Sequence, residues 1–383
     1  MQVRHILLVF ISSFLSCQKN KPTARIYAYT ESIFQVTTPE NFIPQFDRIQ
    51  HYESDSGEFI TIFTRSSNEL HFINLDTKEF HSKVKFPEDG PNGTGLVNGF
   101  HLISQDCLML ASIPPRIKLF NLEGEKKATI PVIDSLNKVD WLGSTNMVPF
   151  LFDGKTLFGT QPFFTDIYQT TQKEASSSRP FYKLNLGEFS KMVKWLPISR
   201  PEDEWKNGKI SPNIAWADRG DSIIISPISD HRLWIVSKKN QRLLGYRETP
   251  TSSIKKFRIL SEYPVGDLEI IKGLESGYYD MILYDKYRGV FYRFFFPPVF
   301  VDNYEQTPWE LKSNKPKIGV LVLDHNLEVI GEKVFSSHQI ETWNYFVGRK
   351  GLYVSTNNPN RNDFDENFLR YEIVRFEGLD YED

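Results

Sequence analysis

The sequence predicts an all-β protein built from repeated units of about four short strands. The first observation is composition: 14% of the 383 residues are aromatic, among them 30 Phe and 17 Tyr. Such residues favour pleated, half-buried strands over helices. The second is repetition, because a hydrophobic strand, a tight turn and a second strand recur at a spacing of about 50 to 70 residues. Repeats of this length are typical of propeller blades. We therefore predict a six-bladed β-propeller, with seven blades as the alternative.

The inner strands of each repeat are recognisable as apolar runs separated by a polar turn. The first strands begin at Arg48, Gly99, Asn146, Asn213, Gly266 and Trp343, and the second strands begin at Gly57, Asp106, Gly154, Gly220, Gly277 and Gly351. Outer hairpins follow from Leu70, Ile117, Phe181, Leu233 and Ile318. In these hairpins apolar residues alternate around a polar turn, as paired strands require.

The sixth repeat differs because it has a single outer strand, Phe368 to Glu377, in place of a hairpin. A propeller has to close its ring, and a strand from the other end of the chain can complete the last blade. The segment from Arg25 to Thr37 has the apolar pattern of a spare strand. We predict that it closes the sixth blade; the alternative is that it crosses the surface without pairing.

The amino terminus has the pattern of an export signal. Arg4 precedes an apolar run from Ile6 to Leu15, which is too short for a helix to cross a hydrocarbon core of about 30 Å. The run ends at Ser16 and Cys17, which resembles a bacterial lipobox and implies a lipid on the Cys17 thiol. The alternatives are a secreted protein with a free cysteine and an uncleaved anchor.

The domain prediction follows from these segments. Residues 1–17 form the lipoprotein signal peptide, residues 18–23 a polar tether and residues 24–383 a single propeller domain. Closed all-β folds often exceed the usual domain length of about 150 residues. We expect a lipid-anchored protein of the cell envelope at the outer membrane. The sequence does not decide between the periplasmic face and the surface face of that membrane.

Composition and motifs exclude several function classes. The formal net charge of −3 gives no basic face for nucleic acid. The eight histidines form no HExxH motif or zinc-spaced Cys/His cluster, and no nucleophile elbow is present. We therefore predict no catalytic residue, no metal and no cofactor. The segment Asn360 to Asn367 is rich in oxygen ligands for a hard cation, although a solvated turn has the same composition.

Two segments supply candidate binding residues. Glu88, Asp89 and Asn92 surround a Gly-Pro turn and could bind a cation or a sugar at the mouth of a central channel. The alternative is a connection between blades that is shaped by the turn. Phe300, Tyr304 and Trp309 lie in a proline-rich insertion and form a candidate binding loop; packing on the blade rim is the alternative. These six residues are our predicted sites beside the lipidation site Cys17.

Three stretches carry a resemblance to a known family: Pro87 to Glu125, Leu321 to Glu332, and Gly351 to Glu377. In them the chain resembles uncharacterised Bacteroidetes lipoproteins with a TolB-like six-bladed propeller fold. The resemblance covers nearly the whole mature chain and implies a fold and a location. Its motifs are turns and strands. The basic Gln18 to Lys21 segment departs from the acidic residues that often follow the cysteine in surface-exported members.

The function that these observations favour is a non-catalytic binding or protein-interaction module, attached to the membrane by its lipid, with an envelope protein or a glycan as partner. The alternative is a metal-dependent hydrolase or lyase with its site at the channel mouth. That alternative requires at least three of the residues Glu88, Asp89, Asp140, Asp218 and Asp267 to converge on one point. A structural role in an envelope assembly is a third hypothesis, since fold alone does not determine function.

Overall fold

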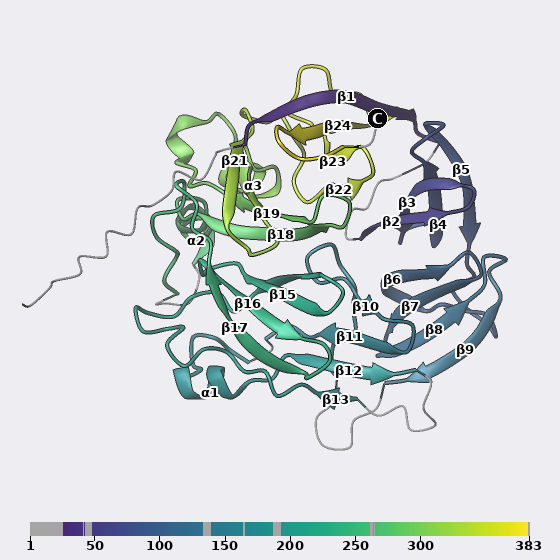
Figure 1. The fold of residues 1–383 in the computed structure, drawn as a ribbon, viewed down its shortest axis with the longest axis horizontal. Coiled ribbons are helices and arrows are strands. Elements are labelled where there is room, and N and C mark those ends of the chain that lie inside the picture. Colours follow the sequence, from purple (N-terminus) through teal and green to yellow (C-terminus); the bar gives the residue numbers. More distant parts are fainter. Residues whose placement is uncertain are drawn as a thin grey trace, which may run out of the picture.

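The computed structural model describes residues 26–40, 42, 48–132, 139–163, 165–186, 193–260, 263 and 265–381. Within them, six antiparallel sheets of four strands each stand around a central axis, as Figure 1 shows. The prediction of an all-β, six-bladed propeller is confirmed. Among the helices of this part of the chain, none is long and apolar enough to cross a membrane.

The first four blades follow the order predicted from the repeats. Blade 1 contains β2 (Ile49–Ser54), β3 (Gly57–Thr64), β4 (Glu69–Asn74) and β5 (Glu79–Lys85). Blade 2 contains β6 (Leu96–Ser104), β7 (Cys107–Ile113), β8 (Arg116–Phe120) and β9 (Lys126–Pro131). Blade 3 contains β10 (Leu151–Phe152), β11 (Thr156–Thr160), β12 (Phe181–Asn185) and β13 (Lys194–Trp195). Blade 4 contains β14 (Ile214–Asp218), β15 (Ser222–Pro227), β16 (Arg232–Ser237) and β17 (Arg242–Glu248).

The fifth blade corrects one of the predicted strands. It contains β18 (Tyr278–Asp285), β19 (Val290–Phe296), β20 (Gly319–Leu323) and β21 (Val329–Val334). The predicted first strand at Gly266 is wrong, because this segment forms the helix α2 (Gly266–Leu274). Its buried residues, Ile270 and Leu274, are four apart and therefore share one helical face. The strand at Gly277 is the inner strand of this blade.

The sixth blade is closed by the amino-terminal strand. It contains β22 (Tyr345–Gly348), β23 (Gly351–Ser355), β24 (Phe368–Phe376) and β1 (Ala28–Thr37). β1 lies antiparallel to β24, with Ala28 opposite Phe376. Phe34 and Val36, two residues apart, are buried in the core of the blade, as alternation along a strand requires. The predicted ring closure is confirmed.

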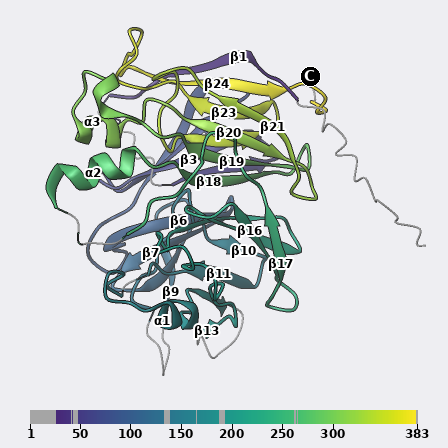
Figure 2. The same ribbon diagram turned by 90° about the vertical axis from the view of Figure 1, so that its left-hand side faces the viewer.

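The two faces of the ring differ in what they carry. We call one the turn face; it holds the turns between the first and second strands, residues 55–56, 105–106, 153–155, 219–221, 286–289 and 349–350. We call the opposite one the helix face; its connections contain α1 (Gln172–Ser177), α2, a short 3₁₀ helix (Val301–Asn303) and α3 (Pro308–Ser313). In Figure 2, α2 and α3 lie on the left, and the carboxyl terminus lies on the right. β1 therefore begins at the turn face, beside the end of β24.

Candidate functional site

The first strands of the six blades surround a cavity of about 540 Å³ at the centre of the ring. Every blade contributes to its wall, for example through Gln50, His101, Phe152, Ala217, Leu283 and Val347. Residues of two inner turns, Arg219 and Gly220 in one and Lys286 and Tyr287 in the other, also line it, so the cavity lies toward the turn face. Its volume falls within the range of small-molecule sites, about 300 to 1,000 Å³.

Arg48, directly before β2, lines this cavity, and its guanidinium has no acidic partner among the described residues. Its Nη1 donates only to the carbonyl oxygen of Ile49, at 3.3 Å, and its Nε is buried without a hydrogen-bond partner among the described residues. Burial lowers the pKa of the guanidinium to about 10. Arg48 therefore stays protonated at neutral pH, and no carboxylate of the described residues pairs with it.

His101 on β6 lies close enough to Arg48 to be affected by its charge. Burial, reinforced by the Arg48 cation, lowers the pKa of His101 to about 3. The imidazole is therefore neutral at physiological pH. Its Nδ1 is also buried without a partner in the described part of the chain, so the cavity wall contains two buried polar atoms, Arg48 Nε and His101 Nδ1, that lack a hydrogen bond there.

The other charged side chains that line the cavity are already paired. Asp218 Oδ2 lies 2.7 Å from Lys238 Nζ. Lys286 forms an ion pair with Glu53. Arg219 donates from Nε to Ser222 Oγ at 3.0 Å and faces Asp221 at 3.7 Å. Among the described residues, the uncompensated positive charge of the wall thus comes from Arg48.

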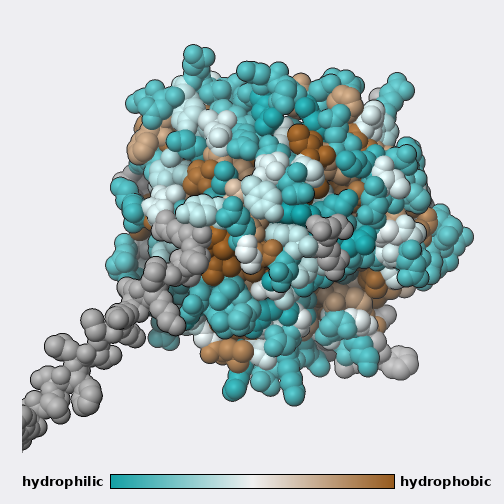
Figure 3. All heavy atoms as spheres, turned by 45° about the horizontal axis from the view of Figure 1, so that its top comes forward, coloured by the Kyte–Doolittle hydropathy of each residue, from teal (hydrophilic) through white to brown (hydrophobic). Residues whose placement is uncertain are grey.

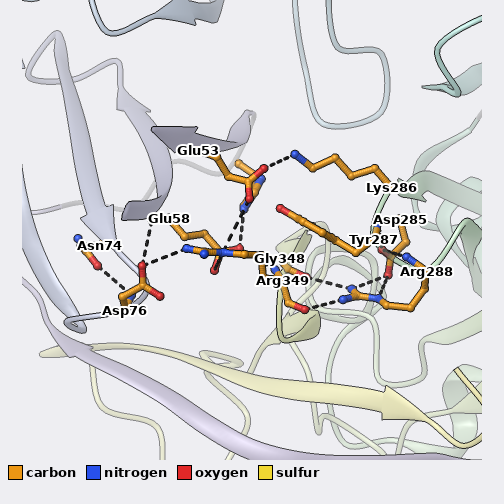
Figure 4. A network of polar contacts seen from close by, with 11 residues as sticks. Glu53, Glu58, Asn74, Asp76, Asp285, Lys286, Tyr287, Arg288, Gly348 and Arg349 are labelled. Atoms are coloured by element: carbon orange, nitrogen blue, oxygen red, sulfur yellow. Dashed lines mark hydrogen bonds and ion pairs between the residues drawn. The ribbon is translucent and has the colours of Figure 1, made fainter. Parts of the chain in front are cut away.

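A polar network holds the wall of the cavity in place between blades 1 and 6. Glu58 on β3 is fully buried and accepts hydrogen bonds from His51 Nε2 at 2.7 Å and from the backbone N–H of Arg349 at 2.6 Å. Arg349 also pairs with Asp76 at 3.2 Å, and Figure 4 shows its side chain between the two carboxylates. Burial opposes ionisation of Glu58, but the donors and charges of His51 and Arg349 outweigh it and lower its pKa.

The same network continues into blade 5. Arg288 donates to the carbonyl oxygens of Gly348 at 3.0 Å and Arg349 at 2.6 Å, and its Nε donates to Asp285 Oδ2 at 2.7 Å (Figure 4). Asp285 also accepts from the hydroxyl of Tyr292 at 3.0 Å. The side chains of Asp285 and Arg288 are at most 1% exposed. Blades 5, 6 and 1 are therefore joined by charge-assisted hydrogen bonds at the turn face.

A second cavity of about 410 Å³ opens at the other end of the channel, at the helix face. It shares Asn146 and Met281 with the first cavity. Glu341 lines it and accepts from Ser355 Oγ and Asn344 Nδ2, each at 2.7 Å. Despite these hydrogen bonds, burial raises the pKa of Glu341 to about 7.

Asp280 lies beside this second cavity, under Trp343. Its Oδ1 accepts from Trp343 Nε1 at 3.1 Å, and its Oδ2 is buried without a partner among the described residues. Burial raises the pKa of Asp280 to about 7. Burial also lowers the pKa of the nearby Lys315 to about 8. The helix end of the channel thus contains carboxyl groups that are partly protonated at neutral pH.

The predicted residues Glu88, Asp89 and Asn92 are exposed and are not part of either channel cavity. Their turn lies against β8, an outer strand, where Lys118 Nζ donates to the carbonyl oxygens of Gly93 at 3.0 Å and Thr94 at 2.7 Å. The structure therefore places these residues away from the channel wall. Binding at this turn stays a prediction.

The predicted loop residues lie on the helix face. Phe300 and Trp309 are 56% and 57% exposed, whereas Tyr304 is partly buried and contacts His338 edge-on. Trp309 Nε1 donates to Asp267 Oδ1 at 3.2 Å, which ties α3 to α2. Two of the three aromatic rings are thus presented to solvent, and their role in binding stays a prediction.

The predicted lipidation site, Cys17, lies outside the described residues.

The residues that the metal-dependent alternative needs do not converge. Asp218 pairs with Lys238, and Asp267 accepts a hydrogen bond from Trp309. Across the described ranges, no group of three or more His, Cys, Asp or Glu side chains is placed to hold a metal ion.

On the side of the molecule drawn in Figure 3, apolar residues form small separate patches among hydrophilic ones.

The family described as "Domain of unknown function (DUF4221)" matches residues 31–334. The chain belongs to the DUF4221 family. The matched range begins in β1 and ends with β21, so it contains the first five blades. The family relationship agrees with the propeller resemblance seen in the sequence; the lipid and the TolB-like relationship stay predictions.

One solved structure supports the fold. The structure of a DUF4221 member from Bacteroides vulgatus superimposes with a TM-score of 0.81 at 21% identity, covering 93% of this chain and 99% of that one. The β-propeller domain of Cps50 (Swd1) from Myceliophteria thermophila gives a TM-score of 0.38 at 10% identity, with 88% and 99% covered. No curated protein matches the chain. At 21% identity the Bacteroides structure establishes the fold and leaves the ligand open.

Sequence reasoning did not single out the two residues that distinguish the cavity of this DUF4221 protein. Arg48 and His101 both occur in predicted first strands, in the segments RIQHYES and GFHLISQ. The available signal was their position, because the first strand of each blade lines the channel. A polar or charged residue in that strand is therefore a candidate for a ligand contact.

Proposed function

We propose that this DUF4221 protein is a lipid-anchored propeller of the cell envelope that binds a small ligand in its central cavity without catalysing a reaction. The observation that supports binding is the cavity wall, where the buried Nε of Arg48 and Nδ1 of His101 have no partner among the described residues. A buried polar group without a hydrogen bond costs about 1–3 kcal/mol. A ligand that accepts or donates at both atoms would recover part of that cost.

The rigid frame around the cavity also favours binding. Glu58, Arg349, Asp285 and Arg288 join three blades through buried, charge-assisted hydrogen bonds. A wall that is fixed before the ligand arrives loses little conformational entropy on binding, which strengthens association. The metal-dependent alternative has no comparable support among the described residues.

The direction of β1 is relevant to the proposed anchor. β1 starts at the turn face, and the chain from Cys17 to Ile26 can extend about 30 Å at most. A lipid on Cys17 would therefore hold the turn face toward the membrane. The helix face, with the exposed rings of Phe300 and Trp309, would then be free to meet an envelope protein or a glycan.

The test is native mass spectrometry of the protein purified from its own membranes. We expect a low-mass compound to accompany the wild-type protein and to be released on denaturation. In Val347→Trp the enlarged side chain fills the cavity, so the compound should be lost; Ala217→Leu, a smaller change in the same wall, is the second variant. Equal retention by both folded variants, or no compound in the wild type, would contradict ligand binding.

The same preparation tests the anchor through Cys17→Ala. Without the thiol no thioether lipid can form, so this variant should leave the membrane fraction and lack the added lipid mass. Retention of Cys17→Ala in the membrane with an unchanged mass would show that Cys17 is not the attachment site.

A further inference from the structure

The charge balance of the central cavity indicates which class of ligand it takes. Of the charged side chains in its wall, Asp218, Arg219 and Lys286 have partners of opposite charge. Arg48 has none among the described residues, and its Nε is buried there without a hydrogen bond. Because removing a charge from water is costly unless the charge is paired, a partly buried cation in a cavity without a counter-ion favours an anionic partner.

We propose that the cavity binds a small organic carboxylate with its acidic group on Arg48 and its apolar part among the inner strands. This inference rests on the proposed ligand-binding function and adds the class of ligand. A guanidinium presents a planar fork of N–H donors that matches a carboxylate in a bidentate arrangement. The unpartnered Nδ1 of His101 supplies a neutral second contact to the same acidic group.

The rest of the wall determines the body of the ligand. Phe152, Leu283 and Val347 present apolar side chains to the cavity, and apolar walls stabilise a hydrocarbon group by about 25 cal/mol per Å² of buried surface. Gln50 offers no free amide, since its two ends bond the backbone N–H and C=O of Leu102, each at 2.8 Å. The ligand is therefore an acid with one charged end.

A single charge favours a carboxylate over a phosphate. A phosphate monoester carries a charge of about −1.5 to −2 at pH 7, and one guanidinium beside a neutral imidazole would leave part of it uncompensated. The carboxylate carries one charge, which Arg48 neutralises. Inorganic phosphate is therefore the discriminating anion in the test.

The experiment measures calorimetric affinities of the purified propeller for hexanoate, octanoate and benzoate, their neutral amides, and inorganic phosphate. We expect at least one carboxylate to bind the wild type about tenfold or more tightly than its amide, and phosphate to bind more weakly. Arg48→Gln should abolish the preference for the carboxylate while the amide affinity stays within about twofold. The matched control is Arg219→Gln, which alters a cation of the same wall that already has partners and should keep the preference.

Arg48→Gln removes an unpaired charge that makes one long hydrogen bond, so its melting temperature should equal or exceed that of the wild type. The proposal is overturned if no carboxylate is preferred over its amide, if Arg48→Gln retains the preference, or if phosphate binds most tightly. Native mass spectrometry distinguishes a failure of the carboxylate assignment from a failure of the proposed ligand-binding function. A compound retained equally by wild type and Arg48→Gln, but lost from Val347→Trp, would uphold ligand binding and overturn the anionic class.

Discussion

The two ends of the central channel both contain buried carboxyl groups, but the pKa values of these groups shift in opposite directions. At the turn face, Glu58 accepts hydrogen bonds from His51 and Arg349, and its pKa is lowered in spite of burial. At the helix face, Asp280 has one side-chain donor, the indole of Trp343, and burial raises its pKa to about 7. Burial alone therefore does not set the ionisation state of a carboxyl group; the number of donors and cations beside it does.

The two ends should respond to pH in opposite directions. Glu58 has a folded pKa below its unfolded value, so its contribution to stability is present at neutral pH and is lost as the pH falls through that folded pKa. Asp280 and Glu341 have folded pKa values of about 7, above their unfolded values. The folded state binds more protons there, so stability falls as the pH rises from about 4 to about 7.

The largest effect should come from Glu58→Ala at the turn face. The substitution leaves His51 and Arg349 without their buried acceptor, and breaking a buried ion pair costs about 3–5 kcal/mol of the free energy of unfolding. Urea denaturation at pH 7 measures the loss. Glu58→Gln keeps one acceptor for the Arg349 N–H and should lose less; equal stability of wild type and Glu58→Ala would show that the network does not join blades 1 and 6.

An intermediate effect is expected from Asp280→Asn at the helix face, and it should depend on pH. The amide cannot ionise, so the variant should gain about 1–3 kcal/mol relative to wild type between pH 5 and pH 8. Denaturant unfolding at both pH values measures this difference. Lys315, whose pKa is about 8, begins to titrate at the upper end of this window in both proteins, so the difference between variant and wild type isolates the carboxyl group.

The matched control for Asp280→Asn is Asp267→Asn, which alters an exposed carboxylate of the same face. It should show no such gain between the two pH values. If Asp280→Asn and wild type lose stability in parallel as the pH rises, the carboxyl group at position 280 does not cause the slope.

The smallest effect is expected from Lys286→Ala. Lys286 pairs with Glu53 at the turn face, but its side chain is 56% exposed, and exposed ion pairs contribute about 0–1 kcal/mol. Thermal or urea unfolding should therefore change little, whereas Arg288→Ala, which removes a buried cation of the same turn, should cost several times more. A loss above about 2 kcal/mol for Lys286→Ala would remove the distinction between exposed and buried pairs.

Much of the fold could be predicted because its signals are local. The turn glycines are one signal: Gly57 and Gly351 have φ values of +134° and +149°, a region that favours residues without a Cβ. The alternation that buries Phe34 and Val36 identified the closing strand. The error in blade 5 arose in α2, where Leu268 and Ile270 alternate as in a strand although Ile270 and Leu274 share a helical face.

The candidate site shows where local signals end. The sequence by itself determined the blades, the tight turns and the closure by β1. These features depend on the alternation of apolar and polar residues along a strand and on the residue types that tight turns require. Only the tertiary structure placed Arg48 near His101 and showed that Glu88 and Asp89 are not among the residues that line the two channel cavities. The distance along the sequence between two blades does not reveal which of their side chains meet at the axis, because that depends on how the ring closes. Closure of the ring also decides which side chains are buried, and burial shifts their pKa values.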